Sequence, residues 1–158
     1  MLVPAIDYTF ELEELFKENQ YSDDVFLAFG QKDFIIPEWG VLNKYQYAVK
    51  DNDLVIGYLE YRVDYETKSV SEIIMINFDK GKISFVKDVY NKFRELLKEF
   101  NRIEFCMVGG NPVEHHYDRL IKTYGGQKLI LHDCIMDRHG KVIDQVIYEI
   151  LCKENGDH

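Results

Sequence analysis

Cysteine is scarce in this sequence and forms no pattern. The three cysteines, Cys106, Cys134 and Cys152, are an odd number at wide spacings, which argues against a disulfide framework and against a zinc site of the CxxC type. The adjacent His115 and His116 cannot form an i, i+4 ligand pair on a helix. We therefore expect reduced thiols and no metal site. Residues 1–5 show no basic segment followed by an apolar one, so no secretion signal is evident, and we expect a cytoplasmic protein.

Long apolar runs and an excess of basic residues are also missing. No stretch approaches the roughly 18 uninterrupted apolar residues of a membrane span, so we expect no membrane partner. Acidic residues outnumber basic ones by 28 to 19, which gives a formal net charge of −9. A nonspecific nucleic-acid binder would need the opposite sign. A cationic substrate such as an amine fits this charge better.

Apolar and aromatic residues are abundant. They make up 46% and 14% of the 158 residues, which excludes a disordered chain. The length predicts one domain, residues 1–158, because single domains commonly run to about 100–200 residues. The 3 prolines and 10 glycines are scattered along the chain, where most of them separate the expected elements. We find no repeat, low-complexity tract or linker.

The spacing of apolar residues predicts the order of the elements. Steps of three and four residues indicate helices, while β-branched and aromatic runs between turn residues indicate strands. Asn111, with Pro112 behind it, is expected to cap the last helix, and His116 is expected to pack in part against the core. The expected elements are short helices at Phe10–Phe16 and Val25–Phe29, strands at Tyr45–Lys50, Leu54–Val63 and Val70–Phe78, a long helix at Ile83–Phe100, a strand at Ile103–Val108, a helix from Asn111 to Tyr124, and a hairpin of Lys128–Met136 with Val142–Leu151.

This order predicts an α+β fold with a mixed, mostly antiparallel sheet. The three strands before the long helix form an antiparallel meander. The step from Val70 through the long helix to Val108 requires a parallel, right-handed crossover. The last two strands close the sheet as a hairpin, with Gly140 in its turn.

One strand-to-helix junction has the chemistry of a phosphate site. It reads Phe78-Asp79-Lys80-Gly81-Lys82-Ile83-Ser84. A helix N-terminus presents unpaired amides and a partial positive charge, Gly81 lets backbone amides approach a ligand, and Ser84 could cap the helix. The alternative is an ordinary turn, since strand-to-helix turns favour glycine and lysines are common near loops.

A second candidate region follows the strand that ends at Val108. Gly109-Gly110 indicates close backbone approach or a splayed strand, or simply a lead into the Asn111 cap. The groups that could transfer protons are Glu60, Glu72, His116 and Tyr117. Each also has a plain structural explanation, such as a solvated strand residue for Glu60 or a core aromatic for Tyr117.

Taken together, the order and these motifs resemble the GNAT superfamily, the GCN5-related N-acetyltransferases, over nearly the whole chain. The family's loop pattern Q/R-x-x-G-x-G/A here reads Phe78-Asp79-Lys80-Gly81-Lys82-Ile83, and only its first glycine is kept. Asn111 matches the family's Asn after the later strand, and Tyr124-Gly125-Gly126 matches the end of its last helix. The amino-acid sequence of this C-terminal half also resembles that of divergent GNAT-like proteins of bacteriophages and prophages.

The resemblance implies a fold and a set of site residues. Helices would cover both faces of the sheet, and the parallel strands ending at Phe78 and Val108 would splay to hold the pantetheine arm of acetyl-CoA. An amide within Ile74, Met75 and Ile76 would polarise the acetyl carbonyl. Glu72 would accept the amine proton, and Tyr117 would replace the tyrosine usually found where this chain has Ile121. The cofactor would also contact Lys80, Gly81, Lys82, Ile83, Ser84 and Asn111.

Three hypotheses follow. The first is an acetyl-CoA-dependent N-acyltransferase that acts by direct transfer on a primary amine, either a small molecule or a peptide. The second is a GNAT-fold binding or interaction module, of phage or prophage origin, that has lost catalysis; the reduced loop pattern and Ile121 favour it. The third is an unrelated α/β protein without acyl chemistry, which an unsplayed sheet would indicate. The sequence is also compatible with a homodimer.

Overall fold

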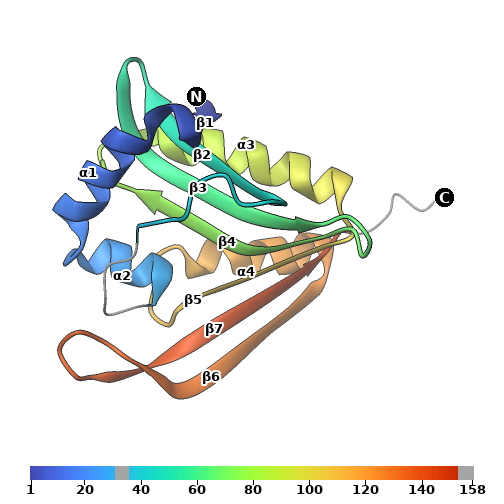
Figure 1. Cartoon of the computed structure of the whole chain (residues 1–158). Helices are drawn as coiled ribbons and strands as arrows, with labels where there is room; N and C mark the ends of the chain where they lie inside the picture. The colour runs from blue at the N-terminus through green and yellow to red at the C-terminus, as the bar shows by residue number, and fades with distance from the viewer. Residues whose placement is uncertain (31–35, 153–158) are drawn as a thin grey trace.

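A seven-stranded sheet with helices on both sides forms the protein (Figure 1). The computed structural model describes residues 1–30 and 36–152. The strand order is β1-β2-β3-β4-β5-β7-β6, and every neighbouring pair is antiparallel except β4 and β5. In chain order the elements are β1 (Leu2–Pro4), a 3-10 helix η1 (Ala5–Tyr8), α1 (Thr9–Asn19), α2 (Asp23–Phe29), β2 (Lys44–Asp51), β3 (Leu54–Asp64), β4 (Ser69–Asn77), α3 (Ile83–Glu99), β5 (Arg102–Val108), α4 (Glu114–Tyr124), β6 (Gly126–Met136) and β7 (Val142–Leu151).

The alternation of side chains along the strands builds one apolar cluster on each side of the sheet. On the side of α1 and α2, which we call the front face, Tyr58 and Ile76 pack with Leu12 and Phe16. On the side of α3 and α4, the back face, Tyr61 and other strand residues pack with the apolar stripe of α3. This stripe consists of Phe85, Val89, Phe93, Leu96 and Leu97.

The predicted fold class is confirmed. The meander, the parallel crossover, the closing hairpin and the helices on both faces are all present. Gly125, with a positive φ of 91°, is the C-cap residue that ends α4 as the sequence indicates, and Gly126, with a φ of 122°, begins β6. The three-residue edge strand β1 and the 3-10 helix after it were not predicted.

Three local predictions are wrong. α4 begins at Glu114 rather than at Pro112, and Asn111 Oδ1 accepts from the Val113 amide (3.1 Å) in a turn before the helix. Ser84 lies inside α3, whose N-cap is Lys82, so it does not cap the helix. His116 is exposed rather than packed, with its ring centroid 3.9 Å from that of His115.

Among the described residues, no helix combines the length and the apolar character needed to cross a membrane.

Candidate functional site

The parallel strands β4 and β5 part almost as soon as they meet. They pair at Ser69 with Arg102 and at Val70 with Ile103, and within the described residues the pairing goes no further. Figure 1 shows the two strands meeting at their amino ends and separating toward α2. Consecutive residues of a strand direct their backbone groups alternately to its two sides. Some amides and carbonyls within Ile74, Met75 and Ile76 therefore face the gap rather than β3.

A β-bulge in β4 lies next to the point of separation. The register with β3 shifts between Glu60–Ile74 and Arg62–Ser71, and Glu72 within the shift has a φ of +52°, which a non-glycine residue seldom adopts. Its carboxylate reaches the front face, where Arg62 Nε donates to Glu72 Oε2 at 3.0 Å. The Glu72 side chain is 55% exposed, so it is accessible to a substrate on that face.

Tyr117 of α4 lines the same gap from the back face. Its hydroxyl donates to Met75 Sδ of β4 at 3.6 Å, and its ring lies edge-on to Phe105 of β5, with centroids 4.6 Å apart. Burial raises the pKa of the Tyr117 hydroxyl, so the group keeps its proton throughout the physiological pH range. Glu72 and Tyr117 are thus placed on opposite faces of the diverging strands.

Residues Asp79–Ser84 form the end of the loop between β4 and α3 together with the first two residues of α3, and they present donor groups. Lys82, the N-cap residue of α3, makes no side-chain capping bond, and the first turn contains no acidic residue. Within the described part of the chain, no acceptor takes the amides of Ile83 and Ser84. Ser84 Oγ is buried without a hydrogen-bond partner among the same residues. These orphan donors suit an oxyanion such as a diphosphate.

Protein carboxylates already engage other parts of this loop. Asp79 Oδ1 accepts from the Gly81 amide at 3.1 Å. Lys80 is paired with Asp24 of α2 at 2.9 Å, and Lys82 with Asp51 of β2 at 2.8 Å. Both lysines are substantially exposed, so these ion pairs are weak and exchangeable. A diphosphate at Ile83 and Ser84 would have Asp79 as its one acidic neighbour within the loop.

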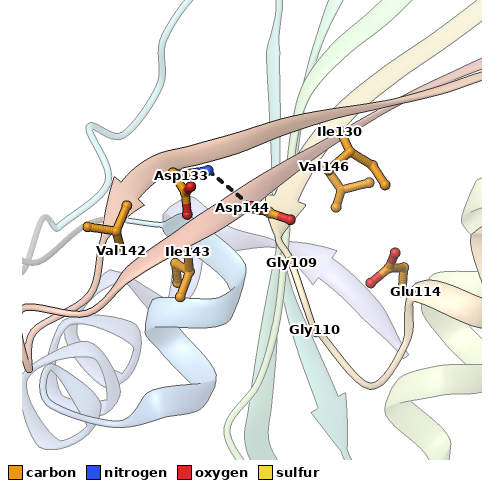
Figure 2. Close-up of a pocket in the computed structure, with 9 residues that line it drawn as sticks. All are labelled: Gly109, Gly110, Glu114, Ile130, Asp133, Val142, Ile143, Asp144 and Val146. Atoms are coloured by element: carbon orange, nitrogen blue, oxygen red, sulfur yellow. Dashed lines mark hydrogen bonds between the residues drawn. The ribbon is translucent and has the colours of Figure 1, made fainter.

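The glycines after β5 have a structural reason. The Gly109 amide donates to the Asp144 backbone carbonyl oxygen of β7 at 2.7 Å, and a Cβ on Gly109 would lie 3.0 Å from the Asp144 Cβ. A cavity of about 320 Å³ lies beside Gly109 and Gly110, and Figure 2 shows the residues that line it. Two of its carboxylates bind protein groups: Glu114 pairs with Lys128 at 2.6 Å, and Asp144 accepts from the Asp133 amide and from His132.

Asn111 joins α2 to the start of α4. Besides the turn it closes with Val113, its Nδ2 contacts the Leu27 carbonyl oxygen at 3.4 Å. This hydrogen bond is long and therefore weak. The Asn111 side-chain amide can therefore also donate to a ligand at the open end of the gap between β4 and β5. The sequence-predicted residues therefore lie in two groups, one along β4 and Tyr117 and one at the two loops that follow β4 and β5.

The front face carries functional groups that sequence patterns did not single out. Arg62 holds the Glu72 carboxylate. Glu104 of β5 lies on the front face, because its neighbours Ile103 and Phe105 belong to the back-face cluster, and no ion pair engages it within the described residues. Strand alternation could have placed Glu104, but the pairing of Arg62 with Glu72 depends on the bulge.

Glu60, a sequence-level candidate for proton transfer, is 2% exposed and fully partnered. Lys44 Nζ lies 2.9 Å from its Oε1. Gln46 Nε2 and the Tyr58 hydroxyl donate to its Oε2 at 2.9 and 2.5 Å. This buried network connects β2 to β3 and leaves no accessible lone pair for a substrate, so its role is structural.

No family model matches this sequence, and no curated protein does so either. Solved structures do match it in fold. An N-acetyltransferase from Staphylococcus aureus Mu50 gives a TM-score of 0.65 at 12% identity, over 97% of this chain and 98% of that one. A "probable" acetyltransferase of the GNAT family from Chromobacterium violaceum ATCC 12472 gives 0.62 at 15% identity, over 96% and 86%.

A third similar structure is the microcin C7 self-immunity acetyltransferase MccE in complex with acetyl-CoA and AMP. Its TM-score is 0.60 at 15% identity, over 95% of this chain and 91% of that one. None of the three bears on the resemblance to phage and prophage proteins, which stays a prediction. The chain therefore shares its fold, a mixed and mostly antiparallel sheet with helices on both sides, with acetyltransferase structures of the GNAT family.

Proposed function

We propose that this protein is an acetyl-CoA-dependent N-acyltransferase that transfers an acetyl group directly to a primary amine. The observation that carries the proposal is the early separation of β4 from β5, with a bulge at Glu72 and the Tyr117 hydroxyl on the two sides of the gap. The GNAT-fold neighbours, one of them in complex with acetyl-CoA, support the same chemistry.

The residues present fit the cofactor. The amides of Ile83 and Ser84, the orphan Ser84 hydroxyl, Lys80 and Lys82 would hold the diphosphate, with Asn111 and the gap-facing backbone of β4 along the pantetheine arm. When bound, acetyl-CoA supplies a thioester whose carbonyl carbon is the electrophile. A backbone amide within Ile74–Ile76 would donate to the carbonyl oxygen as negative charge develops there.

Glu72 accepts the proton that the amine loses, directly or through one water, and so makes the nitrogen nucleophilic. As the C–N bond forms and the C–S bond breaks, Tyr117 donates to the leaving sulfur, so the thiol departs with a proton. The front face around Glu72 also carries Glu104. Two carboxylates there favour the approach of a cationic amine.

A second candidate function is a GNAT-fold binding module without catalysis. Asp79 on the Gly81 amide and Ile121 in place of the usual tyrosine favour it. Cofactor binding without turnover of any amine would separate this module from an enzyme.

The first experiment measures binding of acetyl-CoA and then turnover. At about 100 times its Kd, acetyl-CoA should raise the Tm by about 5–10 °C, and CoA should compete. Thiol release is then followed across a panel of primary amines. No shift at millimolar acetyl-CoA would refute the proposal.

The Glu72→Gln variant tests the base. We expect kcat to fall by about 10²-fold or more, with the KM for acetyl-CoA unchanged. Glu66→Gln, in the exposed turn after β3, is the control. Full turnover by Glu72→Gln, with loss in Glu104→Gln instead, would move the role to Glu104.

A further inference from the structure

A cavity of about 190 Å³ lies on the back face, between the strands β2 and β3 and the C-terminal half of α3. Four tyrosines line it, namely Tyr45, Tyr47, Tyr61 and Tyr65, together with the acidic residues Glu95 and Glu99. We call these six residues the tyrosine cage. It lies on the opposite face from the Glu72 carboxylate and shares no residue with the proposed acyl-transfer site.

Three rings of the cage lie nearly parallel to one another, with interplanar angles of 14° between Tyr45 and Tyr61 and 26° between Tyr47 and Tyr61. Tyr61 is buried. Tyr45 stacks on it with centroids 5.3 Å apart, and Tyr47 stacks on it at 6.0 Å. The hydroxyls of Tyr45 and Tyr65 are bonded to each other at the rim. Tyr45 and Tyr65 are exposed, so the rim of the cage opens to solvent.

The cage already holds one positive charge, the ammonium group of Lys92. Aromatic faces attract cations within about 6 Å of the ring centroid. Lys92 Nζ lies 5.6 Å from the centroid of Tyr47 and 2.5 Å from Glu95 Oε2. Glu99 also lines the cavity, and no ion pair engages it within the described part of the chain. Two carboxylates therefore face one internal ammonium, and a net negative charge remains.

We propose that the tyrosine cage binds a small organic ammonium cation, primary or methylated, which displaces the Lys92 ammonium. The space suffices for such a head group, since about 30 Å³ holds one water and the cavity is about 190 Å³. The glutamates supply charge, and the rings supply the apolar, polarisable surface that a methylated ammonium prefers to water. The proposal goes beyond acyl transfer and needs no CoA.

The test is a calorimetric titration of the full chain, without CoA, with choline and with its uncharged isostere 3,3-dimethylbutan-1-ol. We expect saturable binding of choline and none of the alcohol. Shifts of the aromatic ¹³C signals of Tyr45, Tyr47 and Tyr61 should report the location. Equal binding of both compounds, or shifts elsewhere in the protein, would overturn the proposal.

Two pairs of variants sharpen the test. Lys92→Met removes the internal cation and should tighten choline binding about fivefold, whereas Lys98→Met on the same helix should not. Tyr45→Leu at the rim should weaken binding about two- to fivefold, whereas Tyr21→Leu, an exposed tyrosine between α1 and α2, should not. If neither the natural chain nor Lys92→Met binds choline, the cage is only a packing cluster that Lys92 fills.

Discussion

At the scale of single residues, Asp79 shows how a short motif and its structure can disagree. The sequence Asp79-Lys80-Gly81 suggests a loop whose glycine amide is open to phosphate. In the structure that amide donates to the Asp79 side chain. Among the residues that the structure describes, the next amides without an acceptor are those of Ile83 and Ser84 at the start of α3. This region therefore offers amide donors to a diphosphate, but it also places the negative charge of Asp79 beside them.

The charge of Asp79 should weaken CoA binding. Asp79→Asn keeps an oxygen that can accept from the Gly81 amide but removes the negative charge at the helix N-terminus. We expect the Kd for CoA to fall about two- to fivefold, measured by calorimetry. The gain should shrink at high salt, which screens exposed charges.

The matched control is Asp53→Asn, an exposed carboxylate in the turn between β2 and β3, which should leave the Kd unchanged. Weaker binding in Asp79→Asn would mean that Asp79 holds the loop in its binding conformation and that the diphosphate does not approach it.

At the scale of elements, the contact of α3 with the sheet depends on a glycine. Gly57 of β3 lies under Phe85, in the first turn of α3. A Cβ at Gly57 would lie 2.4 Å from the Phe85 ring and 2.6 Å from the Ile76 carbonyl oxygen. The Phe85 ring would therefore have to move, and the backbone oxygen cannot move without disturbing β4.

Gly57→Ala should therefore destabilise the protein. Overpacking of this kind costs about 1–3 kcal/mol in the free energy of unfolding, which urea denaturation can measure. Gly81→Ala is the control. Its Cβ would meet only the flexible Asp79 side chain at 3.4 Å, so its effect should stay within about 0.5 kcal/mol. Equal stabilities of the two variants would contradict this view of the α3 contact.

The elements themselves were largely predictable, because each long one carries its own period. α3 has a continuous apolar stripe and β3 a run of β-branched and aromatic residues, and both occur where the pattern places them. β1 was missed because three residues carry no period. The start of α4 was misplaced because Asn111 closes a turn with Val113, an alternative that looks the same in sequence.

At the scale of the whole molecule, the topology of the sheet could be predicted better than the contacts between the residues of the site. The parallel crossover follows from chain order and the crossover rule, whereas the separation of its two strands was expected from the resemblance to the GNAT superfamily. The tyrosine cage could not, since Tyr45, Tyr61 and Glu99 come from three elements that only the register and the crossing of α3 bring together. The Arg62–Glu72 pair likewise depends on a bulge that no local pattern indicates.

Four hydrogen-bonded aspartates are expected to make the free energy of unfolding decrease at low pH. The pKa of Asp137 is lowered by the backbone amide of Lys141 and then by that of His139, and the pKa of Asp64 is lowered by Thr67. The pKa of Asp118 is lowered chiefly by the Tyr148 hydroxyl, and that of Asp144 by the Asp133 amide. Each of these groups is more acidic in the folded chain than an unfolded aspartate, whose pKa is about 3.9.

The sign follows from proton linkage. The unfolded chain binds protons more readily at these four positions, so their contribution is complete above about pH 4 and is lost as the pH falls through the lowered folded pKa values. We expect the urea midpoint to fall steeply below about pH 4. Asp137→Asn removes one of the four groups and should flatten that fall, whereas Asp53→Asn should not. A midpoint that falls in parallel in the natural chain and in Asp137→Asn would show that the β6–β7 turn contributes nothing to the acid sensitivity of the fold.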